Sequence, residues 1–198
     1  MRLAITGLGA VSPLGITATE LCDGLLYGRV GIRLAPWADA GGRLFGAVHD
    51  TFDPTAWMDE RVVAGTDGFA RFALAASSQA LADSGLESGE LDTHRTAVVH
   101  GTSMGGLFSV ARAQHDLDTR GADAIDRKTQ IKIWPNMAAA QICMQHDLHG
   151  PSITVTTACA SSLDALGTAA MYLETGLADV ALVGGTDGGY TCDPGQEH

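Results

Sequence analysis

Basic residues are scarce in this chain of 198 residues: lysines and arginines together number 12, against 23 aspartates and glutamates. Only two of the basic residues are lysines, Lys128 and Lys132. The formal net charge of −11 argues against general binding to nucleic acid and against adhesion to an anionic membrane surface. We therefore expect no nucleic-acid partner and no membrane partner.

Long apolar runs and paired cysteine motifs are also missing. No run reaches the roughly 18 apolar residues that a membrane span needs, and the amino terminus lacks the apolar core and cleavage site of a secretory signal. The four cysteines, at positions 22, 143, 159 and 192, form no C-x-x-C pair of the kind that binds zinc or performs redox exchange. These absences predict a reduced, cytoplasmic protein without a metal site.

What the sequence does contain is an alternation of strand and helix patterns. Strands are expected at residues 2–11, 94–103, 152–158 and 179–187, with a short one at 43–48. Helices are expected at residues 17–26, 69–84, 105–117, 135–148 and 161–176, and the polar residues 118–132 are expected to leave the core. This order predicts an α/β layered fold with a mixed, mostly parallel sheet flanked by helices.

The glycine-rich stretch at 7–15, GLGAVSPLG, fits a dinucleotide-binding loop poorly. The pattern G-x-G-x-x-G requires glycine at position 12, where this chain has serine. Pro13 removes an N–H group from the stretch that would hold a pyrophosphate. We therefore expect Gly7 and Gly9 to allow a close approach to neighbouring backbone instead.

Cys159 lies between a strand pattern and a helix pattern, in the stretch TTACASSLDAL. A cysteine at such a turn stands clear of the sheet at a helix N-terminus, where free N–H groups and the helix dipole stabilise a thiolate. The neighbours Ala158 and Ala160 are small, and the N–H group of Cys159 can donate to an oxyanion. The alternative at this position is an inert buried cysteine.

The remaining cysteines and the helix after the turn are given structural roles. Cys22 and Cys143 lie in apolar helical stripes, and Cys192 lies in a polar tail. The stretch that follows Cys159 has a helical period, which places Ser162, Leu166, Ala169 and Leu173 on one face of a predicted helix.

Five segments follow one another in a diagnostic order: ITGLGAVSPLG (5–15), FALAASSQALADSGL (72–86), GTSMGG (101–106), TACASS (157–162) and ADVALVGGTD (178–187). This order resembles that of the β-ketoacyl synthases of fatty-acid and polyketide assembly, which have the thiolase-like fold. The resemblance runs from Met1 to about Gly188, and the TACASS block followed by GGTD is its most specific part.

The resemblance implies that Cys159 takes an acyl chain from an acyl carrier protein as a thioester. A malonyl-type extender then loses CO₂, and the resulting carbanion attacks the thioester. No resident cofactor is implied, because phosphopantetheine arrives on the carrier protein. The family's chain-length factors lack the cysteine, so Cys159 favours a condensing subunit. A non-catalytic interaction subunit and an acyltransferase of the same fold remain as alternatives.

The resemblance also implies that residues 1–198 form only the N-terminal half of such a domain. In the family, the C-terminal half supplies two histidines, a lysine and a second oxyanion donor. The HGTS stretch at 100–103 belongs to the GTSMGG block and is not assigned that role. His94, His115, His146 and His149 are interpreted as solvated or helix-end residues.

A missing half leaves three explanations open: a naturally split enzyme, a truncated or cleaved piece, and a vestigial interaction module. We favour the split enzyme. It predicts a hetero-oligomer with a complementary half that carries the histidines, and the acyl carrier protein as a second partner.

Two further groups of residues are candidates for substrate contacts. Arg127, Lys128 and Lys132 form a basic spot on an acidic chain, which predicts docking of an acidic carrier protein, unless it is an ordinary solvated loop. An acyl channel is the other candidate, with ordinary core packing as the alternative, and it would be lined by Met104, Phe108, Ile133, Trp134, Met137 and Met144.

Overall fold

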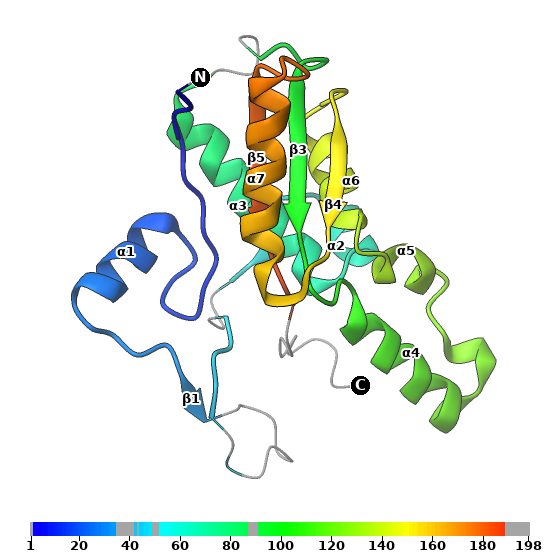
Figure 1. Cartoon of the computed structure of the whole chain (residues 1–198). Coiled ribbons are helices and arrows are strands. Elements are labelled where there is room, and N and C mark those ends of the chain that lie inside the picture. The colour runs from blue at the N-terminus through cyan, green and yellow to red at the C-terminus, as the bar shows by residue number, and fades with distance from the viewer. Residues whose placement is uncertain (1, 35–41, 43, 49–51, 87–90, 189–198) are drawn as a thin grey trace.

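A computed structural model describes residues 2–34, 42, 44–48, 52–86 and 91–188. Its centre is a parallel sheet in the order β4-β3-β5, formed by β3 (Thr96–Gly101), β4 (Ser152–Val155) and β5 (Val180–Gly185). Every residue of β3 is buried, as expected for the middle strand of a sheet with two covered faces. The predicted α/β architecture is therefore confirmed (Figure 1).

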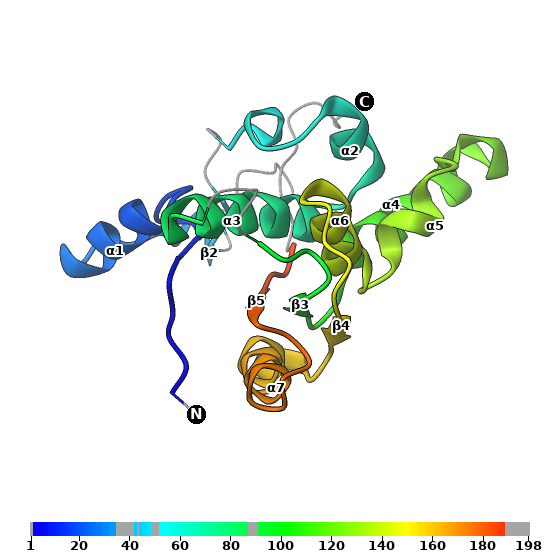
Figure 2. The ribbon, with the colours of Figure 1, turned by 90° about the horizontal axis from the view of Figure 1, so that it is seen from above.

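Helices cover both faces of this sheet (Figure 2). One face packs against α3 (Gly68–Ser84) and α6 (Met137–Gln145), with α2 (Glu60–Gly65) and the short helix η1 (Pro54–Ala56) outside them. The opposite face packs against α7 (Ser161–Glu174). Successive side chains of β3 pack on opposite faces of the sheet. Val98 belongs to the core cluster with α3 and α6, and Val99 belongs to the cluster with α7.

The other elements lie outside this layered body. They are α1 (Ala18–Leu26), the antiparallel pair β1 (Arg33–Leu34) and β2 (Leu44–Phe45), α4 (Leu107–Arg120), η2 (Ala122–Ala124) and α5 (Thr129–Ile133), whereas the short helix η3 (Ala158–Ala160) connects β4 to α7. Helix α1 begins with a capping box, in which Thr17 and Glu20 satisfy each other's backbone N–H groups. Figure 1 shows α4 and α5 projecting from the body, which agrees with the predicted excursion of residues 118–132.

The prediction of a strand at residues 2–11 is wrong, because the described part of this segment lies against α3 and pairs with no strand. The N–H of Leu8 donates to Oδ2 of Asp83 at 2.9 Å, and that of Ala10 donates to Oε1 of Gln79 at 3.2 Å. A Cβ on Gly7 would lie 2.1 Å from the carbonyl oxygen of Ala80, so the close approach expected for these glycines is confirmed.

The helix predicted from the period after Cys159 is confirmed as α7, and small residues form the face that it turns to the sheet. Ala165 and Ala169 are buried there, with Tyr172 packed against the same cluster, whereas Leu166 is 47% exposed. Small side chains let the helix axis approach the sheet closely, and Leu163 and Leu166 lie on the face that the described residues leave uncovered. Of the four residues that the period grouped on one face, Ala169 is buried, Leu173 is partly buried, and Ser162 and Leu166 are exposed.

His100 is a buried histidine of the α3–α6 side, where its Nε2 lies 3.1 Å from Oγ1 of Thr186. Burial lowers the pKa of His100 from 6.5 to about 4. Because the folded pKa lies below the unfolded value, the unfolded state binds more protons between pH 4 and 6.5. We therefore expect roughly 3 kcal/mol of stability that is fully present above pH 6.5 and lost as the pH falls to about 4.

Urea denaturation at pH 7.5, 5.5 and 4.5 measures this effect. His100→Gln should remove this part of the pH dependence, since glutamine keeps a donor for Thr186 and does not titrate. His115→Gln, on the exposed side of α4, is the matched control and should behave as the unsubstituted protein does. An unchanged pH dependence in His100→Gln would contradict the assignment.

Candidate active site

Cys159 lies in η3, at the turn between the carboxyl end of β4 and the first residue of α7. Its side chain is exposed, so the predicted position on a strand–turn–helix is confirmed and a buried core position is excluded. The residue before it, Ala158, has φ of 54°, in the left-handed region that costs a residue other than glycine about 1 kcal/mol. A strained residue beside an exposed thiol is the geometry of a nucleophile turn.

Ser161 holds this turn in place from inside. Its Oγ accepts a hydrogen bond from the N–H of Thr157 at 2.9 Å and lies 2.6 Å from the carbonyl oxygen of Ala158, to which it donates. The same Oγ lies 3.2 Å from the carbonyl oxygen of Thr102, at the end of β3. Both residues that precede Cys159 are thus fixed by one hydroxyl.

Two glycines give α7 its close position above the sheet. Gly101 ends β3, and a Cβ there would lie 2.5 Å from the carbonyl carbon and oxygen of Ser161. Gly185 ends β5 beside it, and its Cβ would lie 2.1 Å from Oγ of Ser162. The N-terminus of α7 therefore sits on strand ends that have no side chains.

The carboxylate of Asp187 fixes the loop that follows β3. Its Oδ1 accepts hydrogen bonds from Oγ1 of Thr102 at 2.9 Å, from the N–H of Ser103 at 3.0 Å and from the N–H of Met104 at 3.1 Å. Its Oδ2 accepts one from Oγ of Ser103 at 2.8 Å. Partial burial raises the pKa of Asp187, but these hydrogen bonds outweigh it and hold the pKa below its ordinary value.

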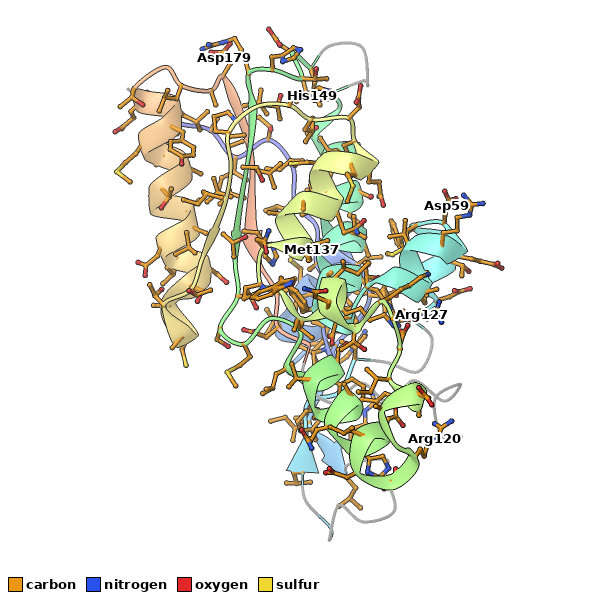
Figure 3. All side chains as sticks on the ribbon, turned by 90° about the vertical axis from the view of Figure 1, so that its right-hand side faces the viewer. Asp59, Arg120, Arg127, Met137, His149 and Asp179 are labelled. Carbon is orange, nitrogen blue, oxygen red and sulfur yellow. The ribbon has the colours of Figure 1, made fainter. Side chains whose placement is uncertain are left out.

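No histidine in the described ranges makes a hydrogen bond with Cys159. His94 and His149 stack on each other, and His149 also lies 3.0 Å from Asp147, before the start of β4. Figure 3 shows His149 near Asp179, at the amino ends of the strands, whereas Cys159 follows a carboxyl end. A six-residue strand separates the two ends by about 20 Å, so this pair cannot serve as the base of Cys159.

The acyl-channel candidates occupy different environments. Met104 and Trp134 are exposed, and Phe108, Ile133 and Met137 are partly buried. Phe108 lines a cleft of about 300 Å³ between the start of α3 and the helices α4 and α5, and most of that lining is polar or charged. Four other candidates do not line this cleft: Met104, Ile133, Trp134 and Met137. Met144 is exposed. The channel stays a prediction.

Of the docking candidates, Lys132 does not form an open basic spot. Its ammonium lies 2.6 Å from Oδ2 of Asp126, and its side chain is 15% exposed. This hydrogen bond holds the pKa of Asp126 below its ordinary value. Arg127 and Lys128 are exposed, and Figure 3 shows Arg127 away from the sheet. Docking therefore stays a prediction that rests on these two residues.

The other cysteines are distributed differently from the prediction. Cys143 packs against the α3–α6 core, as expected. Cys22 is exposed, so its assignment to a buried stripe is wrong, because α1 lies outside the layered body and has only one buried residue, Gly24. Cys192 lies outside the described residues.

Sequence reasoning missed Ser161 and Asp187 as parts of the site. Both belong to motifs that were noticed, TACASS and GGTD, but their partners lie 59 and 85 positions away.

Among the described residues, no group of His, Cys, Asp and Glu side chains is arranged to hold a metal ion. Within the same residues, no helix has both the length and the apolar character that crossing a bilayer requires.

The family follows from comparison with known proteins. The model of the β-ketoacyl synthase N-terminal domain matches residues 1–193, so this chain belongs to the β-ketoacyl synthase family, of which it contains the N-terminal half. Similar solved structures include the ishigamide ketosynthase/chain length factor, at a TM-score of 0.86 and 26% identity over 96% of this chain and 48% of that one. The thiolase-like fold is thereby confirmed.

Curated relatives are similar over the same half. The 3-oxoacyl-(acyl-carrier-protein) synthase 2 of Coxiella burnetii is 34% identical over 94% of this chain and 45% of its own length. A putative polyketide β-ketoacyl synthase 1 of Streptomyces cyaneus is 35% identical over 94% of this chain and 46% of its own length. The chain therefore spans about half the length of the curated relatives that it matches.

Proposed function

We propose that this chain is the cysteine-bearing half of a β-ketoacyl-(acyl carrier protein) synthase. Cys159 accepts the acyl group from the phosphopantetheine of a carrier protein, and the thiol of that phosphopantetheine leaves. A malonyl-type extender then loses CO₂, and its carbanion attacks the Cys159 thioester to give a β-ketoacyl product and a free Cys159. The reaction requires no resident cofactor or metal.

The observation that carries this proposal is the exposed thiol of Cys159 on a strained turn at the N-terminus of α7. Backbone N–H groups at a helix N-terminus stabilise both a thiolate and the oxyanion of an acyl-transfer intermediate. The family of the chain supports the same chemistry.

We further propose that the histidine site comes from a complementary ketosynthase half. Exposed apolar side chains support the proposal of a partner chain. Helix α7 exposes Leu163, Leu166 and Met171 on the side away from the sheet. The amino-terminal segment likewise exposes Leu3 and Ile5. In the solved neighbour from Xenorhabdus doucetiae a ketosynthase is in complex with its chain length factor, which supports a hetero-oligomer here.

Acylation of Cys159 is the first expected outcome. Incubation with an acyl thioester of an acyl carrier protein should add the mass of one acyl group to the intact protein, because acyl transfer needs the thiol but not the extender. Cys159→Ala should abolish the adduct. Cys22→Ala, which removes an exposed thiol on α1, is the matched control and should leave the adduct unchanged.

Condensation separates the proposal from its alternatives. With the complementary half and a malonyl thioester, the acylated chain should release CO₂ and lose its adduct. An adduct without CO₂ release would indicate an acyltransferase of the same fold. Absence of any adduct in the presence of the complementary half would overturn the proposal and indicate a chain-length-factor-like interaction subunit. That second candidate is favoured by the neighbours that contain a chain length factor.

A further inference from the structure

Asp187, Thr102 and Ser161 connect the end of β5 to the turn that presents Cys159, and we call these three residues the brace. Asp187 lies two residues beyond β5 and binds Thr102 and the two residues after it. Thr102 is buried and lies one residue beyond β3, and its carbonyl oxygen lies within hydrogen-bond distance of Ser161. The brace thus joins three parts of the chain that meet at the carboxyl ends of the strands.

The first joint of the brace depends on a negative charge. The Asp187 carboxylate accepts from two hydroxyl groups and from the N–H groups of Ser103 and Met104. Hydrogen bonds to a carboxylate are roughly twice as strong as those between neutral groups. An asparagine at this position would lose that charge and would direct an N–H₂ group toward donors of Ser103. The loop at 102–104 would then lose part of its restraint.

The second joint depends on one buried hydroxyl. Ser161 is 3% exposed, and its single proton is within reach of the carbonyl oxygens of both Ala158 and Thr102. Its lone pairs accept from the N–H of Thr157. A displacement of Thr102 therefore acts on the hydroxyl that orients the two residues before Cys159. Because Ala158 is held in the left-handed region, this turn relaxes once its restraints weaken.

We propose that Asp187 and Ser161 are positioning residues that set the orientation of the Cys159 thiol, Asp187 through Thr102 and Ser161 directly. The proposal rests on the proposed function for the identity of the nucleophile. Neither residue is required to contact the substrate. Loss of either joint lets the turn relax and changes the orientation in which the exposed thiol of Cys159 is presented before α7, which lowers its reactivity although its exposure does not fall.

Alkylation by iodoacetamide, followed by peptide mapping, tests the proposal and needs no acyl carrier protein. Cys22 in the same sample is the reference thiol. At pH 7, Asp187→Asn and Ser161→Ala should each lower the rate at Cys159 relative to Cys22 about fivefold, the effect of losing one hydrogen bond. The double variant should resemble the stronger single variant, because both act on one path.

Asp83→Asn is the matched control, since its carboxylate also holds a remote segment, through the N–H of Leu8, but at the far end of α3. It should leave both thiols unchanged. An unchanged ratio of Cys159 to Cys22 in Asp187→Asn would overturn the brace, as would a faster Cys159, which indicates a thiol that is merely more exposed. The two proposals can fail separately. If the iodoacetamide rates change as expected but no carrier protein gives an acyl adduct, the proposed function is contradicted and the brace is retained.

Discussion

Gly101→Ala should destabilise the protein by about 3 kcal/mol and abolish acylation of Cys159. A Cβ at position 101 would lie 2.5 Å from the carbonyl carbon and oxygen of Ser161 and 2.7 Å from the N atom of Ser162. All three are backbone atoms, so no side-chain rotation relieves the overlap. The N-terminus of α7 must move away from the sheet, and the turn with Cys159 moves with it.

Gly184→Ala is the matched control for this substitution. Gly184 is the register partner of His100, one position before Gly185, and a Cβ there would meet nothing within 4 Å. Urea denaturation gives the stability of both variants, and intact mass after incubation with an acyl carrier protein thioester gives the adduct. If Gly101→Ala and Gly184→Ala have the same stability and the same acyl adduct, the close packing of α7 on Gly101 is not required for the site.

Leu163→Asp should abolish assembly with a complementary half while leaving the isolated chain unchanged. The side chain of Leu163 is 74% exposed on the uncovered face of α7, so aspartate there should change the free energy of unfolding by less than about 0.5 kcal/mol. Within an interface, the same carboxylate would be buried without a partner and would cost several kcal/mol, which is about a thousandfold or more in affinity.

Purification of the tagged chain from the cells that produce it measures this difference. We expect a second ketosynthase-type polypeptide with the unsubstituted protein and none with Leu163→Asp. Leu26→Asp is the matched control, because Leu26 is 81% exposed on α1, away from α7, and should retain the second polypeptide. Retention of that polypeptide by Leu163→Asp would exclude this face of α7 as the site of assembly.

Local patterns predicted the turn around Cys159 because its determinants are close together in the sequence. An alternating β-branched stretch, a small-residue turn and a helical period all lie within residues 152–174, and β4, η3 and α7 form there. Helix α3 was predicted for the same reason, and Gly85 ends it with φ of 69°.

Features that depend on distant residues were not predictable in this way. Residues 2–11 have the composition of a strand, but a strand forms only where a ladder partner exists, and Asp83 and Gln79 take two of their N–H groups instead. The inward face of α7 depends on how closely the helix approaches Gly101 and Gly185, which periodicity does not contain. Asp187 similarly joins the site only through its contact with Thr102.

The contact between Asp187 and Thr102 also bears on the order in which the molecule folds. It joins residues 85 positions apart, and contacts of such long sequence separation form late because the intervening chain must first be ordered. During synthesis, Cys159 is made 28 residues before Asp187. In the proposed brace, the restraint on the turn that carries Cys159 is therefore complete only after β5 has paired with β3, so the orientation of this turn is set late in the assembly of the sheet.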